Sequence, residues 1–142
     1  MKVSEVMTAQ VVTATPETSV RKVAKMMSEI DSGAMPVMEE DRVIGMVTDR
    51  DIVLRVVADG GDLDQAVRGV MSEGVQTCSA EDTLADATAK MGAHQVRRLV
   101  VLNDAGRLAG ILSLGDVAAD YGAKQVGRTL EEISEPVDET AH

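Results

Sequence analysis

The chain has 142 residues, enough for one compact domain or two small ones that share a core. Its 24 acidic and 14 basic residues give a formal net charge of -10, which argues against a nucleic-acid surface, because polyanions are bound by concentrated basic side chains. The chain has no Trp, no Phe and one Tyr, so it cannot build the aromatic platforms on which single-strand binders stack bases.

Two features bear on the cellular compartment. No apolar run approaches the ~18 residues that a membrane-spanning helix needs, and the N-terminus lacks the apolar stretch of a signal peptide. The single cysteine, Cys78, cannot form an internal disulfide. These features predict a protein of the reducing cytoplasm that does not enter a membrane.

The sequence contains an internal repeat. A single shift aligns the run Val3–Thr8 with Val67–Ser72. The same shift aligns Val11 with Val75, Thr13 with Thr77, Glu17 with Glu81, Met27 with Met91, and Val37 with Val101. The second copy has one inserted residue in the region 103–107, after which Gly45 aligns with Gly110, Thr48 with Ser113, and Asp51 with Asp116. Two copies are too few for a long solenoid, so they predict two halves related by pseudo-twofold symmetry, each covering the other's apolar face.

Each copy is expected to begin with the same short elements. A helical turn comes first, at about Val3–Met7 and Leu63–Met71, and an extended piece follows at 11–13 and 75–77.

A helix is then predicted in each copy. In the first copy Thr15 can cap a helix that has Pro16 at its first position, and in the second copy the run Ser79–Asp82 has the form of a capping box. Apolar residues recur at helical spacing after these starts: Val20, Val23, Ala24, Met27 and Ile30 in the first copy, and Leu84, Ala87 and Met91 in the second.

A hairpin and a second helix complete each copy. The predicted strands, which flank polar turns at 39–42 and 103–107, are Met35–Met38 with Val43–Val47, and Leu99–Leu102 with Leu108–Leu112. The second helix is expected to begin at Thr48 or Ser113, and the first of these to end near Gly60. The predicted class is therefore α+β, with the order β-α-β-β-α twice.

The chain after Tyr121 does not repeat. Leu130 and Ile133 can anchor one helical turn there, and the acidic residues from Glu135 onward are expected to be disordered. The predicted organisation is repeat 1 over 1–61, repeat 2 over 62–121 and an extension over 122–142.

Two runs carry a family resemblance. Gly45-Met-Val-Thr48-Asp-Arg-Asp51-Ile resembles the C-terminal signature of a CBS motif, named for cystathionine β-synthase, and Gly110-Ile-Leu-Ser113-Leu-Gly-Asp116-Val resembles it equally well. The upstream pieces 31–37 and 94–101 are also similar to the family. The resemblance covers about residues 1–121, and the chain looks most like stand-alone bacterial proteins made of one CBS pair, a Bateman-type module.

The resemblance implies a function. CBS pairs have two clefts between the repeats, which hold AMP, ADP, ATP or another adenosine-containing ligand, and they often form face-to-face homodimers. The ligand is regulatory, because it changes the shape or the assembly of the module and so controls a partner protein.

The duplicated signature supports nucleotide binding on physical grounds. In Thr48-x-x-Asp51 and Ser113-x-x-Asp116 a strand gives way to a helix, whose free N–H groups suit a phosphate, and the carboxylate can accept from both ribose hydroxyls. Charged hydrogen bonds of this kind contribute roughly 1.5–3 kcal/mol each. The alternative is that each hydroxyl-x-x-Asp is a plain capping box.

Further candidate residues surround these signatures. Arg97 and Arg98 can fork onto phosphate oxygens, whereas the first copy has Gly33 and Ala34 at the aligned positions and offers Arg50 instead, so the two clefts are expected to differ in affinity. The alternative for the arginines is a solvated pair that balances an acidic protein. The candidates for base contact are Thr13, Met35, Pro36, Thr77, Leu99 and Val100, and the alternative for them is simple core packing.

No motif predicts catalysis. The sequence has no His and Cys cluster at metal-ligand spacing, no Gly-x-Ser-x-Gly and no P-loop lysine motif. The predicted protein is therefore a cytoplasmic nucleotide sensor without a catalytic cofactor or metal. The competing hypothesis is a ligand-independent protein-interaction or stress-response scaffold whose clefts are degenerate.

Overall fold

A computed structural model describes the backbone of residues 1–120 and 123–134, and the side chains of residues 1–120 and 129–134. Packing divides the chain into two compact units of mixed helix and strand, which confirms the predicted class. We call Gln10–Val75 the first-repeat unit, and Met1–Ala9 together with the residues from Gln76 onward the second-repeat unit. The predicted disordered tail lies outside the described residues.

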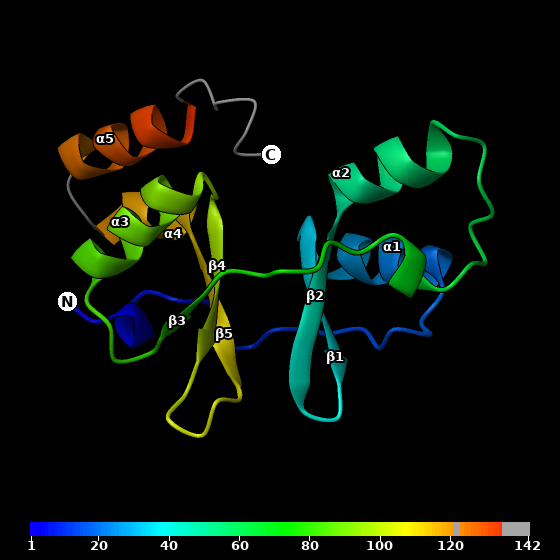
Figure 1. Cartoon of the computed structure of the whole chain (residues 1–142), viewed down its shortest axis with the longest axis horizontal. Coiled ribbons are helices and arrows are strands. Elements are labelled where there is room, and N and C mark those ends of the chain that lie inside the picture. Colours follow the sequence, from blue (N-terminus) through cyan, green and yellow to red (C-terminus); the bar gives the residue numbers. More distant parts are fainter. Residues whose placement is uncertain (121–122, 135–142) are drawn as a thin grey trace. The chain divides into compact units, whose positions relative to one another are not determined.

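The first-repeat unit is built around one hairpin (Figure 1). Its elements are α1 (Val20–Ile30), β1 (Ala34–Glu39), β2 (Arg42–Thr48), α2 (Asp49–Ile52), a π-helical segment η2 (Val53–Val57) and a 3-10 turn η3 (Val67–Gly69). Strands β1 and β2 pair antiparallel. The core includes Val20, Val23, Met27, Met35, Val37, Val47, Ile52, Val56, Val67 and Met71.

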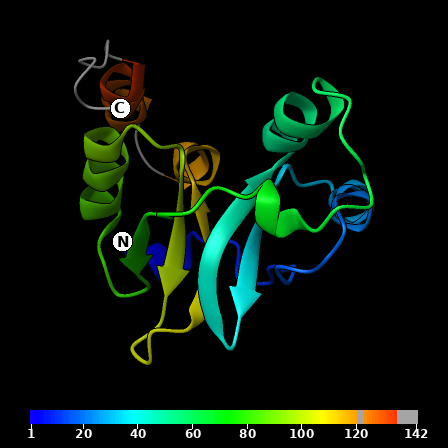
Figure 2. The same cartoon turned by 45° about the vertical axis from the view of Figure 1, so that its right-hand side comes forward.

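The second-repeat unit repeats this plan with one more strand and one more helix (Figure 2). Its elements are η1 (Val3–Glu5), β3 (Thr77–Ser79), α3 (Leu84–His94), β4 (Arg98–Leu102), β5 (Leu108–Ser113), α4 (Leu114–Asp120) and α5 (Ala123–Ser134). In the sheet β4 is central, parallel to β3 and antiparallel to β5. The core includes Val3, Cys78, Leu84, Ala87, Met91, Leu99, Val101, Leu112 and Val117.

Both predicted hairpins are confirmed, with different turns. In the first hairpin Glu40 and Asp41 both have positive φ, 51° and 65°, as a tight two-residue turn between strands requires. In the second hairpin the side-chain oxygen of Asn103 accepts from the backbone N–H groups of Ala105 and Arg107, and Gly106 has φ 76°. The inserted residue between the copies is therefore accommodated in this longer turn.

The predicted helix starts are wrong by several residues in both copies. Helix α1 begins at Val20, because Ser19 is the N-cap and accepts from the N–H of Lys22. Helix α3 begins at Leu84, capped by Thr83. Ser79–Asp82 forms a separate turn instead, in which the Asp82 carboxylate accepts from the N–H of Ser79 at 2.9 Å. Local side-chain-to-backbone bonds of this kind compete with helix formation.

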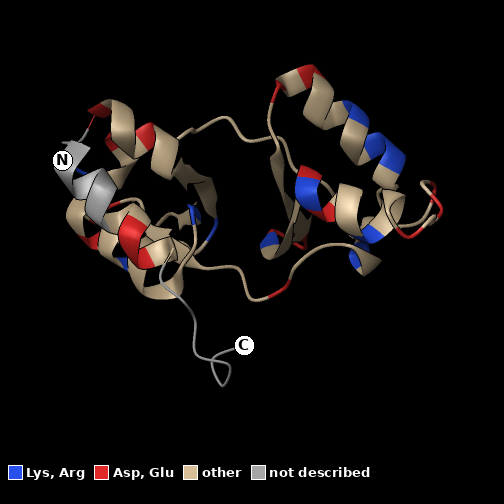
Figure 3. Cartoon of the chain, turned by 90° about the horizontal axis from the view of Figure 1, so that it is seen from above, with Lys and Arg blue, Asp and Glu red and all other residues tan. Residues whose placement is uncertain are grey.

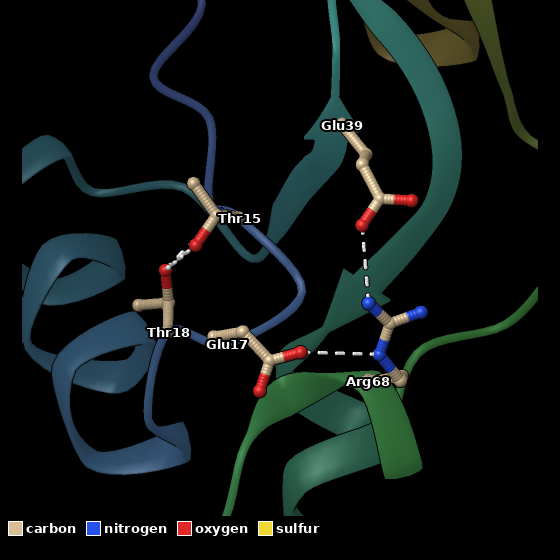
Figure 4. Close-up of polar contacts among 5 residues, drawn as sticks. All are labelled: Thr15, Glu17, Thr18, Glu39 and Arg68. Carbon is tan, nitrogen blue, oxygen red and sulfur yellow. Dashed lines mark hydrogen bonds and ion pairs between the residues drawn. The ribbon is translucent and has the colours of Figure 1, made fainter.

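The turn before α1 has a second reason not to be helical. The hydroxyl of Thr18 accepts from the N–H of Thr15 at 3.0 Å, and the carbonyl of Pro16 accepts from the N–H of Arg68 at 3.0 Å. The Arg68 guanidinium then bridges Glu17 and Glu39, at 3.2 and 3.1 Å (Figure 4). The turn is thus held by η3, a segment distant in the sequence.

Each 3-10 turn packs on the copy to which it does not belong in the sequence. The N–H of Val3 donates to the carbonyl of Asp82 at 2.9 Å, and the N–H of Val67, the aligned residue, donates to Thr18 at 2.8 Å. The residues that follow the turns repeat this pattern. Thr8 exchanges two backbone hydrogen bonds with Ile111, and the aligned Ser72 exchanges two with Met46. The boundaries of the sequence repeats therefore differ from the boundaries of the packing units.

The extended pieces before the helices lie a little later than expected. In the second-repeat unit the piece becomes β3, whereas in the first-repeat unit it is an isolated parallel bridge between Ala14 and Val37. The predicted strand residues 11–13 lie outside any strand.

The C-terminal extension forms more helix than the single turn predicted. Helix α5 spans Ala123–Ser134, with Ile133 packed against the core of the second-repeat unit. Among the helices of the described residues, none is long and apolar enough to cross a membrane.

Two strand glycines leave space for the segments that follow the 3-10 turns, each of which packs on the other copy. A Cβ on Gly110 would lie 2.5 Å from the carbonyl oxygen of Thr8 and 2.9 Å from the sulfur of Met7. A Cβ on the aligned Gly45 would lie 2.9 Å from the carbonyl oxygen of Ser72. A side chain at either glycine would therefore push the exchanged segment away from the strand.

We expect Gly110→Ala and Gly45→Ala each to destabilise the protein by about 1–3 kcal/mol, as overpacking does. The control is Gly115→Ala, because its Cβ would meet only the Ser113 hydroxyl at 3.7 Å. Urea unfolding followed by circular dichroism measures all three variants. Wild-type stability of the Gly110 and Gly45 variants would contradict the close approach.

Candidate functional site

The two hydroxyl-x-x-Asp signatures form reciprocal capping boxes. In the first-repeat unit the Asp51 carboxylate accepts from the N–H of Thr48 at 2.9 Å, and the Thr48 hydroxyl accepts from the N–H of Asp51 at 3.1 Å. Ser113 and Asp116 repeat both bonds at 3.1 Å. Each cap occupies one carboxylate oxygen, and Asp51 also lies 3.8 Å from the Arg55 guanidinium. The second oxygen of Asp116 has no protein partner among the described residues.

The sheet register brings the candidate phosphate ligands of the second copy together. Arg98 is paired with Ser113 across β4 and β5, and the carbonyl of Arg97 accepts from the N–H of Leu114 at 2.9 Å. These residues line one pocket of about 400 Å³, together with Gly115, Ala118 and Leu130. The grouping of Arg97, Arg98 and Ser113 in one pocket is what a phosphate site requires.

The two arginines are free to bind an anion. Both side chains are exposed, and within the described part of the chain neither forms an ion pair or a side-chain hydrogen bond. Helix α4, Leu114–Asp120, has only two turns, so its dipole adds little, and the positive charge of this pocket comes from the arginines.

The corresponding pocket of the first-repeat unit has the opposite charge. It has a volume of about 260 Å³ and is lined by Asp31 and Asp49, beside Gly33. The backbone frame is the same, because the N–H of Asp49 donates to the carbonyl of Gly33 at 2.9 Å. A Cβ on Gly33 would lie 2.7 Å from the Asp49 carboxylate.

The end of α1 makes this pocket still less suited to a phosphate. Met27, Ser28 and Asp31 line it from the C-terminal end of α1, where the helix dipole is negative. Helix α1 carries its basic residues toward its start, whereas its one acidic residue, Glu29, and the capping residue Asp31 lie at its end (Figure 3). Arg50, the expected substitute for the arginine pair, is exposed but does not line this pocket.

The candidates for base contact are mostly core residues in this structure. Met35, Leu99 and Val100 are fully buried, and Pro36 is buried as well. Thr13 and Thr77 are half-buried, and the carbonyl of Thr77 accepts from the Lys90 ammonium. Contact of these six residues with a base therefore stays a prediction.

Sequence reasoning missed three features of these pockets. Leu130 was predicted as a helix anchor rather than a pocket residue, and nothing in its local sequence indicates that it faces Arg97 and Arg98. Asp31 and Asp49 were also missed, although the alignment of Asp49 with Leu114 is a visible departure from the repeat.

A third pocket, of about 330 Å³, contains the only cysteine. It lies at the end of β3 and is lined by Cys78, Asp82 and Lys90 among others. The pKa of the Cys78 thiol is raised to about 11, chiefly by burial and also by the nearby Asp82 carboxylate, with Lys90 acting in the opposite direction. The thiol is thus protonated at neutral pH, unlike a nucleophilic or metal-binding cysteine. The described residues contain no group of three or more His, Cys, Asp and Glu placed to hold a metal ion.

The family follows from a comparison with known domains. The model of the CBS domain matches residues 3–58 and 67–121. The chain belongs to the CBS domain family. Both copies of the repeat lie within the match, whereas α5 lies beyond its end.

Relatives of this CBS pair include proteins of similar length. The chain is 38% identical over 133 residues to the CBS domain-containing protein YhcV of Bacillus subtilis, covering 93% of this chain and 94% of YhcV. It is 33% identical over 116 residues to Hypoxic response protein 1 of Mycobacterium tuberculosis, covering 80% of each chain. A CBS domain protein from Pyrobaculum aerophilum complexed with AMP is similar in structure, with a TM-score of 0.77 and 26% identity over 91% of this chain and 98% of that one.

We expect the buried thiol to make stability depend on pH above neutrality. The pKa of Cys78 is raised from 9.0 to about 11, so its contribution to stability is complete below pH 9 and is lost as the pH rises toward about 11. Urea unfolding at about pH 8 and about pH 10.5 should show a smaller loss of stability in Cys78→Ala than in the wild type. Equal losses in both proteins would contradict the raised pKa.

Proposed function

We propose that this CBS pair is a regulatory sensor that binds an adenine nucleotide, AMP, ADP or ATP, with its phosphate in the pocket lined by Arg97, Arg98 and Ser113. The observation that carries the proposal is the convergence of two guanidinium groups and a hydroxyl on one pocket of about 400 Å³. Neither guanidinium group forms an ion pair with a residue that the structure describes. Guanidinium groups that are not engaged by a carboxylate of the described residues can offer their donors to phosphate oxygens.

The caps leave room for ribose recognition. The oxygen of Asp116 that the capping box does not use can accept from a ribose hydroxyl. In the first copy the corresponding oxygen of Asp51 lies 3.8 Å from the Arg55 guanidinium, so a ribose there would share it with Arg55. The remaining proposed ligand contacts are Thr13, Met35, Pro36, Thr48, Arg50, Thr77, Leu99 and Val100. The AMP complex of the related P. aerophilum protein supports the ligand class.

The two copies are proposed to differ in affinity. The pocket of Asp31 and Asp49 repels a phosphate, whereas the pocket of Arg97 and Arg98 attracts one. We therefore assign the tighter phosphate site to the second-repeat unit. Ligand binding there would change the shape or assembly of the module and so control a partner protein.

Replacing the arginines tests the site directly. Each of Arg97→Ala and Arg98→Ala should weaken ATP binding about tenfold or more, because a charged hydrogen bond contributes roughly 1.5–3 kcal/mol. Isothermal titration calorimetry gives the dissociation constants for AMP, ADP and ATP. Arg107→Ala is the matched control, because Arg107 is an exposed arginine of the same unit in the turn before β5.

The outcomes separate the two functional hypotheses. A ligand at 100 times its dissociation constant should stabilise the wild type by about 2.7 kcal/mol per site. If none of the three nucleotides binds or stabilises the protein, the sensor is excluded and the interaction scaffold becomes the better hypothesis.

We also propose a homodimer, the assembly that many CBS pairs adopt. Three apolar side chains of the π-helical segment η2 are exposed, namely Val53 at 54%, Leu54 at 49% and Val57 at 60%. Neighbouring apolar residues at this exposure are costly in a monomer, and a second copy of the chain would cover them.

Charge placed on η2 should dissociate the dimer. We expect Leu54→Glu to shift the protein toward the monomer in sedimentation equilibrium, because it would bury an unpaired carboxylate. Val12→Glu places the same charge on an exposed apolar residue of the same unit, outside η2, and should leave the assembly unchanged. A wild-type protein that is monomeric at every concentration would overturn the proposal.

A further inference from the structure

Helix α5 is a packed part of the second-repeat unit, although it lies beyond the CBS match. Thr129 is only 2% exposed, and Ile133 contacts the core of this unit. The side-chain amide of Gln95, at the end of α3, donates to the carbonyl of Glu132 at 3.2 Å. These contacts fix the position of α5 against α3.

A glycine permits this packing. Gly92 is buried in α3, and a Cβ there would overlap the carboxylate of Glu132 and lie 3.1 Å from its Cβ. The absence of a side chain at residue 92 therefore lets α5 approach α3 closely. A Cβ there would displace the flexible carboxylate of Glu132 and press on its Cβ, which weakens the packing of α5 on α3.

The docked helix presents one side chain to the phosphate pocket. Leu130 lines it together with Arg97 and Arg98, and its side chain remains 37% exposed. The neighbouring Thr129 is buried. One residue of α5 thus holds the helix in place while the next forms part of the pocket wall.

We propose that α5 is part of the ligand site, so that nucleotide binding and the docking of α5 on α3 stabilise each other. The inference rests on the proposed function and adds a residue, Leu130, and a route by which the ligand acts on the chain beyond the CBS repeats. A ligand that contacts Leu130 binds more tightly when α5 is docked, and by linkage its binding increases the docked population.

Two substitutions of opposite charge at residue 130 test whether this residue lies at the ligand site. Leu130→Lys and Leu130→Glu both remove the apolar side chain, but they place opposite charges beside a bound phosphate. One unit charge at about 4 Å in water is worth about fivefold in affinity, so the two variants should differ by about 25-fold in ATP affinity. The same two substitutions at Ser134, exposed on α5 and outside the pocket, should differ much less.

Separating the helices tests the coupling. Gly92→Ala should weaken the docking of α5, because the new Cβ displaces the Glu132 carboxylate and presses on the Glu132 Cβ. If only a tenth of the molecules remain docked, the apparent dissociation constant for ATP rises about tenfold. Adding Glu132→Ala removes most of the overlapping atoms and should restore affinity. In the wild type, hydrogen exchange of the α5 amides should slow when ATP is added.

The inference and the proposed function fail differently. If ATP binds the wild type but the Leu130 variants bind equally and α5 exchange does not change, α5 is outside the site and only the inference is overturned. If no nucleotide binds the wild type, both are overturned. Opposite effects of Lys and Glu at residue 130, with slower α5 exchange, support the inference even if Gly92→Ala fails to fold.

Discussion

The exchange of the two 3-10 turns is the constraint on which the rest of the structure depends. Each turn donates its backbone N–H groups to the other copy, as Val3 does to Asp82 and Val67 to Thr18. Their apolar residues also fill the cores of the units they join. Neither copy therefore completes its own core from its own sequence repeat. This explains why the strands carry glycine where the exchanged backbone passes.

The same backbone frame holds two pockets of opposite charge. In each copy the N–H at the start of the second helix donates to the loop before the hairpin, from Asp49 to Gly33 and from Leu114 to Arg97. The charged side chains on this frame differ, with carboxylates in one copy and guanidinium groups in the other. Duplication thus supplied the geometry twice, while the chemistry that suits a phosphate is present once.

The sequence was sufficient for the hairpins and for the signatures, because both depend on local patterns. Apolar runs that flank polar turns predicted the strands, and the family resemblance placed Arg97 and Arg98 beside one of the expected clefts. The predicted helix starts were wrong because the side chains of Thr15–Thr18 and Ser79–Asp82 hold turns. The same residue types at the same spacing are also typical of a helix N-terminus, so the sequence could not separate the two. Aligning the two copies shows which segments are equivalent, but not on which copy each segment packs. The exchange of the 3-10 turns and the position of Leu130 in the pocket could therefore be seen only in the structure.

Because Asp51 and Asp116 cap helices, substituting them cannot by itself show whether they bind a ligand. Asp116 accepts the N–H of Ser113 with one oxygen, so removing its carboxylate costs a helix cap, typically about 1 kcal/mol, whether or not a nucleotide binds. A loss of affinity in such a variant therefore mixes stability with recognition. Arg97 and Arg98 have no such structural bond from their side chains in the described residues, so their removal reports on the anion alone. The arginine pair is consequently the feature that separates a nucleotide site from a helix cap.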